Sequence, residues 1–446
     1  MVRIKNFLLP FVLMVANAVV GCSNYGASNQ SSDEENISKL VEGLSGTSSQ
    51  SVKLPTASAG MLDFLEYAVA ISPEIATLRA EEVRAKSGID LAFSANRPQV
   101  NASSSVGGYK ADISSGAFER GASVSLNVSQ LLFDGGGAES ELSAAELRLA
   151  LAETSTQVAI NRLSTEAAVA GVSLLLAEEE LLVVQEFQAE IKPYAAQLRR
   201  MSQSGLIDRS MLDEINGRLL EIDIAVQEAK SAFNVAEMEY SKYFGDLSAS
   251  TQNFVLPDRF EKIALSDTSF LNAPAVRESA LRVILAEKQL AIARSAFYPK
   301  VTAEAGSASP MDPNESLSAQ AGVRLTYQLG DGGARAANLS MAKADKEKAK
   351  RAAELIVDDT KKTLRALSAR IDNIAEVHRL SEKKLPILVD QLKVAESQIQ
   401  TGQANIQKVF EAKLKVNDLE RRIRHSRVEL VKAKLDMAAA LGLFSI

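Results

Sequence analysis

The side chains best suited to chemistry are few in this sequence, and they do not form a catalytic set. Both histidines lie in helical heptad patterns, and no paired histidine, cysteine cluster or nucleophile motif accompanies them. His378 occupies a heptad core position beside Ser381, which favours a polar break in a helix seam over a metal ligand. Asp134-Gly135-Gly136-Gly137 lacks the lysine of a phosphate-binding loop, so a strand-to-helix turn explains it. We therefore expect no enzyme activity, no metal site and no cofactor.

The single cysteine is better placed for lipidation. Arg3 and Lys5 precede an apolar run over residues 7–20 that ends in Val19-Val20-Gly21-Cys22. The run is too short for a membrane-spanning helix and is typical of a secretion signal. Because its last four residues resemble the bacterial lipobox, we predict that residues 1–21 are a lipoprotein signal peptide and that Cys22 is lipidated, with palmitate among its acyl chains.

The residues after the cysteine favour the outer membrane and a flexible attachment. Ser23 stands where an aspartate would be the usual signal for retention in the inner membrane of enteric bacteria. Residues 22–57 are rich in serine, asparagine and glycine, so we predict a lipidated flexible tether.

The chain has no tryptophan, 5% aromatic residues and a formal net charge of -6. That composition favours long helices and argues against nucleic acid as a partner.

The elements that must position any functional residue occur in two copies. The landmarks that repeat are Arg97-Pro98-Gln99-Val100 with Tyr298-Pro299-Lys300-Val301, Asp134-Gly135-Gly136 with Asp331-Gly332-Gly333, and Ser204-Gly205 with Thr401-Gly402. The offset is 201 positions for the proline pair and 197 for the later pairs, so four residues are lost between the proline and Asp-Gly-Gly landmarks. We predict two equivalent repeats, residues 58–245 and 271–446, with an equatorial linker over 246–270.

Each repeat contains one predicted β-hairpin, over residues 98–133 and 299–329. Apolar and polar residues alternate there, as in the run from Ala122 to Leu132, so one strand face is apolar and the other polar. Alternation alone also fits a soluble hairpin. Charges on the polar face, at Glu304 and Arg324, and aromatic residues near the strand ends favour a membrane barrel. Since a spanning sheet must close and bacterial barrels begin at about eight strands, four strands per chain require an oligomer.

After each Asp-Gly-Gly turn the apolar period becomes that of a coiled coil. Helical hairpins are predicted over 137–245 and 334–442, each with one long helix, a glycine tip and a return helix; the seam of the first return helix includes Ile215, Ile222, Ala229 and Ala236. The first long helix would reach about 100 Å, and its return helix only about 60 Å. Short helices over 59–95 and 271–297 have the right length to stack end to end with the return helices. Pro193 and Pro386 are expected to bend the long helices near the tips.

A duplicated unit with these parts in this order resembles the TolC family of outer-membrane efflux proteins. The motifs that carry the resemblance are Arg97-Pro98-Gln99, Leu131-Leu132-Phe133-Asp134-Gly135-Gly136, Tyr298-Pro299, Asp331-Gly332-Gly333, Ser204-Gly205-Leu206 and Thr401-Gly402. The resemblance implies a mainly α fold with membrane β structure. Three chains would each give four strands to one 12-stranded outer-membrane β-barrel, and their coiled-coil hairpins would continue it as an α-barrel tunnel across the periplasm of a Gram-negative bacterium.

The same resemblance implies the function of a passive exit duct in a tripartite efflux or type I secretion system. The duct would be a homotrimer that docks to a periplasmic adaptor protein and is driven by an inner-membrane transporter. Substrate class stays open between small molecules and secreted proteins. The competing interpretation is a periplasmic coiled-coil adaptor or scaffold lipoprotein, but adaptors have one helical hairpin, whereas this sequence predicts two helical hairpins and two amphipathic β-hairpins.

The resemblance also implies roles for residues at the helical tips. Six residues would contact the adaptor: Gly205, Leu206, Ile207, Gly402, Gln403 and Ala404. The family's gate places acidic side chains six and nine positions after the second tip glycine, where this sequence has Lys408 and Glu411, so only one of the two is acidic. The first tip offers Asp208, Asp213 and Glu214. We therefore predict a gate formed by a mixed Lys408/Glu411 ring or by the acids of the first tip.

Overall fold

The computed structural model describes residues 40, 54–55, 59–109, 119–205, 208–247, 254–261, 263, 266, 268–310, 316–400 and 406–444. The chain divides into two units, residues 1–53 and 54–446, and every helix and strand discussed below belongs to the second. The predicted lipidation site Cys22 lies outside the described residues, as do five of the predicted tip contacts: Leu206, Ile207, Gly402, Gln403 and Ala404.

The two repeats share a helix, two strands, a long helix and a return helix in the same order, and the first has an additional helix, α3, before them. The first has α3 (Met61–Ile71), α4 (Pro73–Ser94), β1 (Gln99–Tyr109), β2 (Glu119–Phe133), α5 (Gly137–Gln203) and α6 (Arg209–Phe244). After α7 (Asp258–Glu261) and η2 (Ser269–Asn272), the second has α8 (Pro274–Ser295), β3 (Lys300–Ala308), β4 (Ser318–Thr326), α9 (Ala334–Gln400) and α10 (Ile406–Ala440). The predicted mainly helical fold with one β-hairpin per repeat is confirmed, although β4 ends three residues before the predicted boundary at 329.

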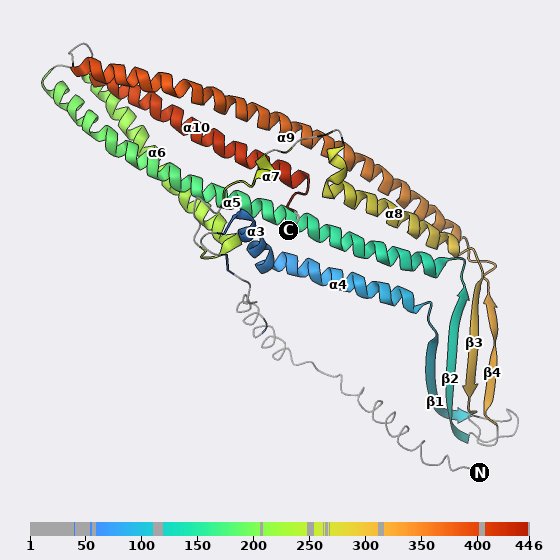
Figure 1. The fold of residues 1–446 in the computed structure, drawn as a ribbon. Helices are drawn as coiled ribbons and strands as arrows, with labels where there is room; N and C mark the ends of the chain where they lie inside the picture. The colour runs from blue at the N-terminus through green and yellow to red at the C-terminus, as the bar shows by residue number, and fades with distance from the viewer. Residues whose placement is uncertain are drawn as a thin grey trace. The chain divides into compact units, whose positions relative to one another are not determined.

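The helices lie in a row that is built around the two long ones (Figure 1). On the half nearer the strands α5 packs against α4 and α8, and on the other half it packs against α6 and α10. The second long helix, α9, packs against α8 and α10. The short and return helices therefore share the length of each long helix, as predicted, and α5 and α9 run without a break through Pro193 and Pro386. No helix of the described residues is both long enough and apolar enough to cross a membrane.

The largest apolar core lies midway along the row, where α3 and the ends of α6 and α10 meet α5. Phe64, Phe244 and Phe254 form a ring cluster with centroids 5.3–5.8 Å apart. Gly171 of α5 faces this cluster, and a Cβ atom there would lie 2.2 Å from the ring of Phe254. A glycine at this position therefore lets the chain after α6 pack directly on α5.

The end of α10 is held by a buried side chain of α5. Asn161 donates a hydrogen bond to the carbonyl oxygen of Ala439 (2.5 Å), and its own side-chain oxygen accepts one from the N–H of Phe444 (3.2 Å). A helix end leaves carbonyl groups without intrahelical partners, and a buried amide can satisfy one of them. Asn161 thereby joins the end of the second repeat to the first.

The four strands form one antiparallel sheet in the order β1-β2-β3-β4. Gln99 pairs with Ser129 in the first hairpin, and the equivalent residues Lys300 and Thr326 pair in the second. The same holds at the far end, where Gly107 with Gly121 corresponds to Ala308 with Ser318. Because the register is the same in both copies, the four-residue difference lies in the hairpin loops beyond these pairs.

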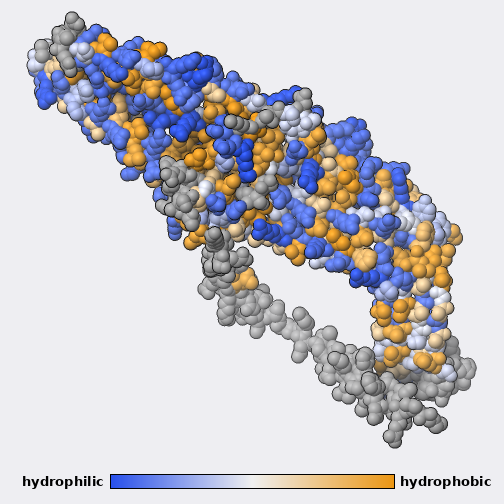
Figure 2. All heavy atoms as spheres, in the orientation of Figure 1, coloured by the Kyte–Doolittle hydropathy of each residue, from blue (hydrophilic) through white to orange (hydrophobic). Residues whose placement is uncertain are grey.

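The register places all the alternating apolar residues on one face of the sheet. That face contains Val100, Ala102, Val106, Ala122, Val124, Leu126, Val128, Val301, Ala303, Ala305, Ala319, Ala321, Val323 and Leu325. Although apolar, Leu126 is 47% exposed and Val323 68% exposed in the single chain. Figure 2 shows this apolar surface over the strands. A β-bulge between Leu131 and Phe133 makes Phe133, rather than Leu132, the partner of Val301.

The first Asp-Gly-Gly turn caps α5 and directs it away from the sheet. The carboxylate of Asp134 accepts hydrogen bonds from the N–H groups of Gly136 (3.1 Å), Gly137 (2.9 Å) and Ala138 (2.7 Å). These are donors that the first turn of a helix leaves without partners. Gly135 has a φ of +74°, and a Cβ there would lie 2.6 Å from the Cβ of Tyr298. The turn therefore requires this glycine for two independent reasons.

The second turn adds an arginine that the first turn lacks. Arg335, at the position of Ala138, donates from Nε to Asp331 (2.8 Å) and from its guanidinium group to the carbonyl oxygen of Gln328 (2.7 Å). The guanidinium group also lies over the rings of Phe297 and Tyr327, at 5.5 Å and 5.7 Å from their centroids. Arg335 thus joins the start of α9 to the segments that follow α8 and β4.

Replacing Asp331 should remove a pH-dependent part of the stability. Hydrogen bonds from the backbone and side chain of Arg335 lower the pKa of Asp331 to about 2. A carboxyl group with a lowered folded-state pKa stabilises above its unfolded pKa of about 4, and this contribution is lost as the pH falls toward 2. We expect Asp331→Asn to melt at a lower temperature than the parent at pH 7, with the difference shrinking between pH 4 and 2. An unchanged difference across that range would contradict this role.

Candidate gate at the helical tips

The described part of the first tip is shaped by backbone requirements. Gly205 has a φ of +74°, which ends α5 in the left-handed conformation that glycine adopts at low cost. Asp208 then precedes α6, and its carboxylate accepts a hydrogen bond from the N–H of Met211 (2.8 Å). Of the acids predicted for the gate, Asp208 therefore serves as a helix cap, and Asp213 is exposed on the next turn.

Behind the tips, an apolar cluster joins the two helical hairpins of the chain. Its buried members are Phe187, Ile191, Ala195 and Leu198 of α5, Ile215 and Ile222 of α6, and Ile406 and Phe410 of α10. Phe410 is 2% exposed, and Ile191 and Leu198 are fully buried. Because α10 belongs to the second repeat and α5 and α6 to the first, this cluster, named here the tip core, couples the position of one tip to the other.

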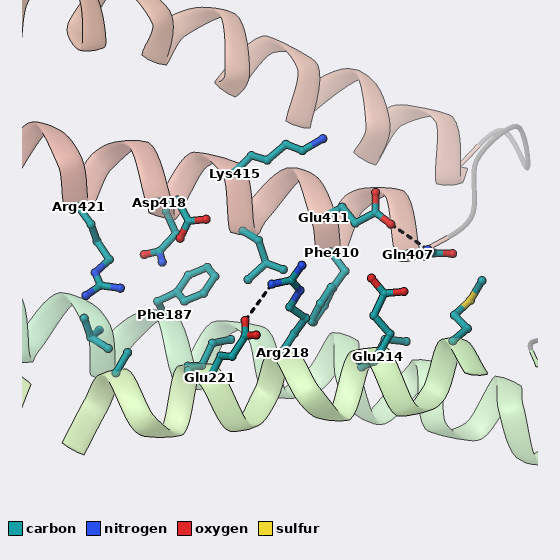
Figure 3. Close-up of a pocket in the computed structure, with 17 residues that line it drawn as sticks. Phe187, Glu214, Arg218, Glu221, Gln407, Phe410, Glu411, Lys415, Asp418 and Arg421 are labelled. Atoms are coloured by element: carbon teal, nitrogen blue, oxygen red, sulfur yellow. Dashed lines mark hydrogen bonds and ion pairs between the residues drawn. The ribbon is translucent and has the colours of Figure 1, made fainter. Parts of the chain in front are cut away.

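A furrow of about 500 Å³ runs between α6 and α10, with α5 as its floor (Figure 3). Glu214 of α6 and Glu411 of α10 both line it, so the structure brings together candidates that the sequence had offered as alternatives. Phe410 points from α10 toward α6, and Arg218 points from α6 toward α10 and pairs with Glu221 at 2.9 Å. Further charges in the wall are Lys415, Asp418 and Arg421.

Lys408 lies on the other side of α10. Its ammonium group donates to the side chain of Gln398 on α9 at 3.1 Å, and it lines a second hollow of about 590 Å³ between α9 and α10. Glu411 lines both hollows, whereas Lys408 does not line the furrow with Glu214. Glu411 therefore lies next to both alternatives, with Glu214 in the furrow and with Lys408 in the second hollow.

One buried cation was missed by the sequence analysis. Lys413 of α10 is 10% exposed at its side chain and reaches Glu190 of α5 at 2.5 Å and Glu396 of α9 at 3.3 Å. Burial acts to lower the pKa of Lys413, but the hydrogen bond and charge of Glu190 outweigh it and leave the pKa raised. A signal was present, since Lys413 lies four residues after Val409 and three before Val416, on the side of the apolar seam.

Farther from the tips, Glu180 of α5 joins the same two hairpins. Its carboxylate receives Arg421 at 2.7 Å and Arg424 at 3.2 Å, both from α10. Together with Lys413, these ion pairs give α10 charged contacts with α5 at two levels. Any displacement of the second hairpin away from the first has to separate both groups of charges.

His378 has the role in packing that the sequence predicted. Its Nδ1 lies 2.9 Å from the hydroxyl of Ser426 on α10, and its Nε2 lies 3.4 Å from Glu382 on the next turn of α9. Among the described residues, no group of three or more His, Cys, Asp or Glu side chains is arranged to hold a metal ion.

A protein-family model described as outer membrane efflux protein matches this chain twice, over residues 65–245 and 265–443. The chain belongs to this family. One match falls on each structural repeat, and together they span most of the sequence. This outer membrane efflux protein is thus an outer-membrane exit duct by family, a conduit rather than an enzyme. A search of curated proteins found no match to the chain.

Solved structures of bacterial channels share its fold at low sequence identity. CusC superposes with a TM-score of 0.75 at 16% identity, covering 88% of this chain and 98% of CusC. VceC of Vibrio cholerae gives 0.73 at 15% identity, covering 87% and 99%, and the open state of MtrE from Neisseria gonorrhoeae gives 0.68 at 16%, covering 89% and 94%. The efflux protein therefore has the full length of this fold.

The gate candidates can be separated by ion preference. If Lys408 and Glu411 form a mixed ring, Lys408→Asp should raise cation preference several-fold at low salt, because each subunit then exchanges a positive for a negative charge. If the acids of the furrow set the preference, Glu214→Gln and Glu411→Gln should lower it and Lys408→Asp should change it less. Reversal potentials in planar bilayers under a KCl gradient measure both effects. No change in cation preference with Lys408→Asp would contradict the Lys408 ring.

Proposed function

We propose that three copies of this chain form one closed channel that carries substrates out through the outer membrane. The observation that supports this most directly is the sheet, whose four strands share one apolar and one polar face and leave β1 and β4 as open edges. An open edge with unpaired backbone groups is not tolerated in lipid, so the sheet has to close. Joining β4 of one copy to β1 of the next closes it with the apolar face toward lipid.

Exposed apolar residues on the outer helices of the row support the same closure. On α9, Leu380, Ile387 and Val394 recur every seven residues and are each more than half exposed. On the opposite side of the row, Ile224, Val235 and Met238 of α6 are also more than half exposed. Apolar stripes with this spacing are typical of helix faces that pack on another helix. In the proposed trimer α9 of one copy packs against α4 and α6 of its neighbour.

The channel itself is passive, so the proposal includes partners that supply energy and select substrates. A periplasmic adaptor would dock at the tips, at Gly205, Leu206 and Ile207 of the first and Gly402, Gln403 and Ala404 of the second, and would link the duct to an inner-membrane transporter. Lipidation of Cys22 would anchor the chain in the outer membrane of a Gram-negative cell. Both small-molecule efflux and type I protein secretion are compatible with such a duct.

The oligomer is tested with the full-length protein purified in mild detergent. We expect a trimer by mass measurement, a heat-modifiable band on gels and channel activity in planar bilayers. Leu380→Glu with Ile387→Glu should weaken the trimer, because each variant copy places two charges in the apolar contact. Lys393→Glu should not, because Lys393 is exposed on the same helix but points more than about 100° away from both positions. A monomer that is soluble after removal of the lipid anchor would defeat the proposal.

Adaptor docking is tested separately from assembly. A photoreactive amino acid at Gln203, next to the first tip, should crosslink in living cells to a periplasmic adaptor protein identified by mass spectrometry. The same group at Gln99, beside the membrane strands, should not give that product. A trimeric channel that yields no adaptor adduct from the tip would contradict docking while leaving the duct itself intact.

A further inference from the structure

One ion pair stands out on the polar face of the sheet. Arg324 of β4 binds Glu304 of β3 through two contacts, Nε to Oε1 at 2.7 Å and a terminal guanidinium nitrogen to Oε2 at 2.7 Å. The other polar-face residues of the four strands are mostly Ser, Asn, Thr, Gln and Gly. Among the described strand residues, this is the one salt bridge.

The alternation of the strands determines where this pair lies in a closed barrel. Glu304 and Arg324 alternate with the apolar residues Ala303, Ala305 and Val323, whose face must contact lipid. The pair therefore faces the lumen, and three copies put three such pairs at one height. The direct cross-strand partners of Glu304 are Gly322 of β4 and Ser129 of β2, so both positions directly opposite the carboxylate are small.

The fold does not need these charges. The equivalent positions in the first repeat are Ser103 and Asn127, which are neutral although the two hairpins have the same register. That hairpin is bridged instead by hydroxyl groups, with Ser103 and Ser125 2.7 Å apart. The side chains of Arg324 and Glu304 are 64% and 26% exposed, and ion pairs exposed to this degree contribute little to stability. A purely structural reason for the pair is therefore weak.

We infer that Glu304 and Arg324 together set the electrostatic potential of the barrel lumen and hence its selectivity for charged cargo. The two charges cancel within each pair, so the parent lumen is nearly neutral at this height. Loss of Arg324 would leave three carboxylates and favour cations, and loss of Glu304 would leave three guanidinium groups and favour anions. The inference rests on the proposed closed barrel, with its polar face inward.

A local chemical probe tests this without interference from the helical tips, which lie in series with the barrel. Ser129 pairs directly with Glu304 across β2 and β3, and Ser129→Cys introduces a thiol on the polar face. The experiment compares its reaction rates with a trimethylammonium and a sulfonate methanethiosulfonate in the detergent-purified trimer. The same reactions on the parent protein subtract any labelling of the native Cys22.

The expected effects have opposite signs in the two variants. Relative to the parent protein, Arg324→Gln should raise the ratio of cationic to anionic reagent rates about fivefold at low salt, and Glu304→Gln should lower this ratio about fivefold. This magnitude is the effect of one uncompensated unit charge that lies about 8 Å from the reagent's charge in water. The double variant should return the ratio to the parent value, which damage to the fold cannot imitate. High salt should reduce both shifts. Ser123→Cys, about 20 Å farther along β2, should show little change in any background.

Two outcomes separate this inference from the proposed barrel. If Ser129→Cys reacts readily but its rate ratio is the same in all four charge backgrounds, the selectivity role is wrong and the barrel stands. If Ser129→Cys reacts no faster than Leu126→Cys on the apolar face, the polar face does not line a water-filled lumen, and both the barrel and this inference fail. A variant that does not assemble is replaced by Glu304→Ser or Arg324→Asn, the residues of the first repeat, under the same criteria.

Discussion

Leu126→Arg is expected to prevent assembly of the barrel, whereas Ser125→Arg, one residue earlier on β2, is expected to be tolerated. Leu126 lies near the middle of its strand on the apolar face, beside Ala102 and Ser307. Ser125 lies on the polar face, where its hydroxyl group contacts that of Ser103. Leu126 and Ser125 point to opposite faces of the sheet but lie at nearly the same depth along the strand.

The expected size of this difference follows from the cost of a charge in lipid. An arginine on the lipid face near the bilayer midplane costs about 2–4 kcal/mol in outer-membrane barrels, and a trimer carries three of them. On the lumen face the guanidinium group stays in water, so Ser125→Arg loses only an exposed hydroxyl contact. The yield of heat-modifiable trimer in outer-membrane fractions measures both variants. Equal trimer yields, whether both high or both low, would contradict the assignment of the faces.

Phe410→Ala is expected to loosen the helical tips without unfolding the rest of the chain. Phe410 is 2% exposed in the tip core, where α10 packs against α5 and α6. Truncating a buried phenylalanine to alanine typically costs about 3–5 kcal/mol. Because the tip core is separate from the larger core that contains Phe244 and Phe254, we expect the loss to stay local.

Hydrogen exchange gives the measurement for this variant. Amides in residues 187–222 should exchange faster in Phe410→Ala than in the parent, and those in residues 59–95 should be unchanged. Leu182→Ala, at an α5 residue that is 55% exposed and outside the tip core, provides the matched control and should leave exchange in both regions unchanged. Faster exchange spread evenly over both regions would show that the tip core is not an independent unit.

Much of the architecture was predictable because it follows from periodicity and repetition. The alternation of apolar residues determined which face of each strand carries Leu126 and Val323, and the heptads identified Ile215 and Ile222 as buried. Both patterns are local in sequence and so need no knowledge of the tertiary fold. The duplicated landmarks then indicated that the second hairpin would repeat the first.

The parts of the site that could not be predicted depend on contacts between distant helices. Lys413 meets Glu190, and Glu180 meets Arg421, across more than 200 residues of sequence. No periodicity relates α5 to α10, so charge pairing between them is visible only in the structure. For Asp208 the difficulty is different, because its capping contact with Met211 is local in sequence. An acidic residue near a tip fits both a helix cap and a gate. Residue type alone did not separate these two roles.

The pairing of β2 with β3 makes the centre of this chain equivalent to a boundary between subunits. These two strands belong to different repeats and meet edge to edge, as β4 and β1 of neighbouring copies would in the closed barrel. In evolutionary terms, the protein is a fused pair of half-size building blocks. Fusion lets the two repeats diverge in sequence while they still alternate around the channel axis. Arg335 can therefore replace Ala138 at every second Asp-Gly-Gly turn of the ring.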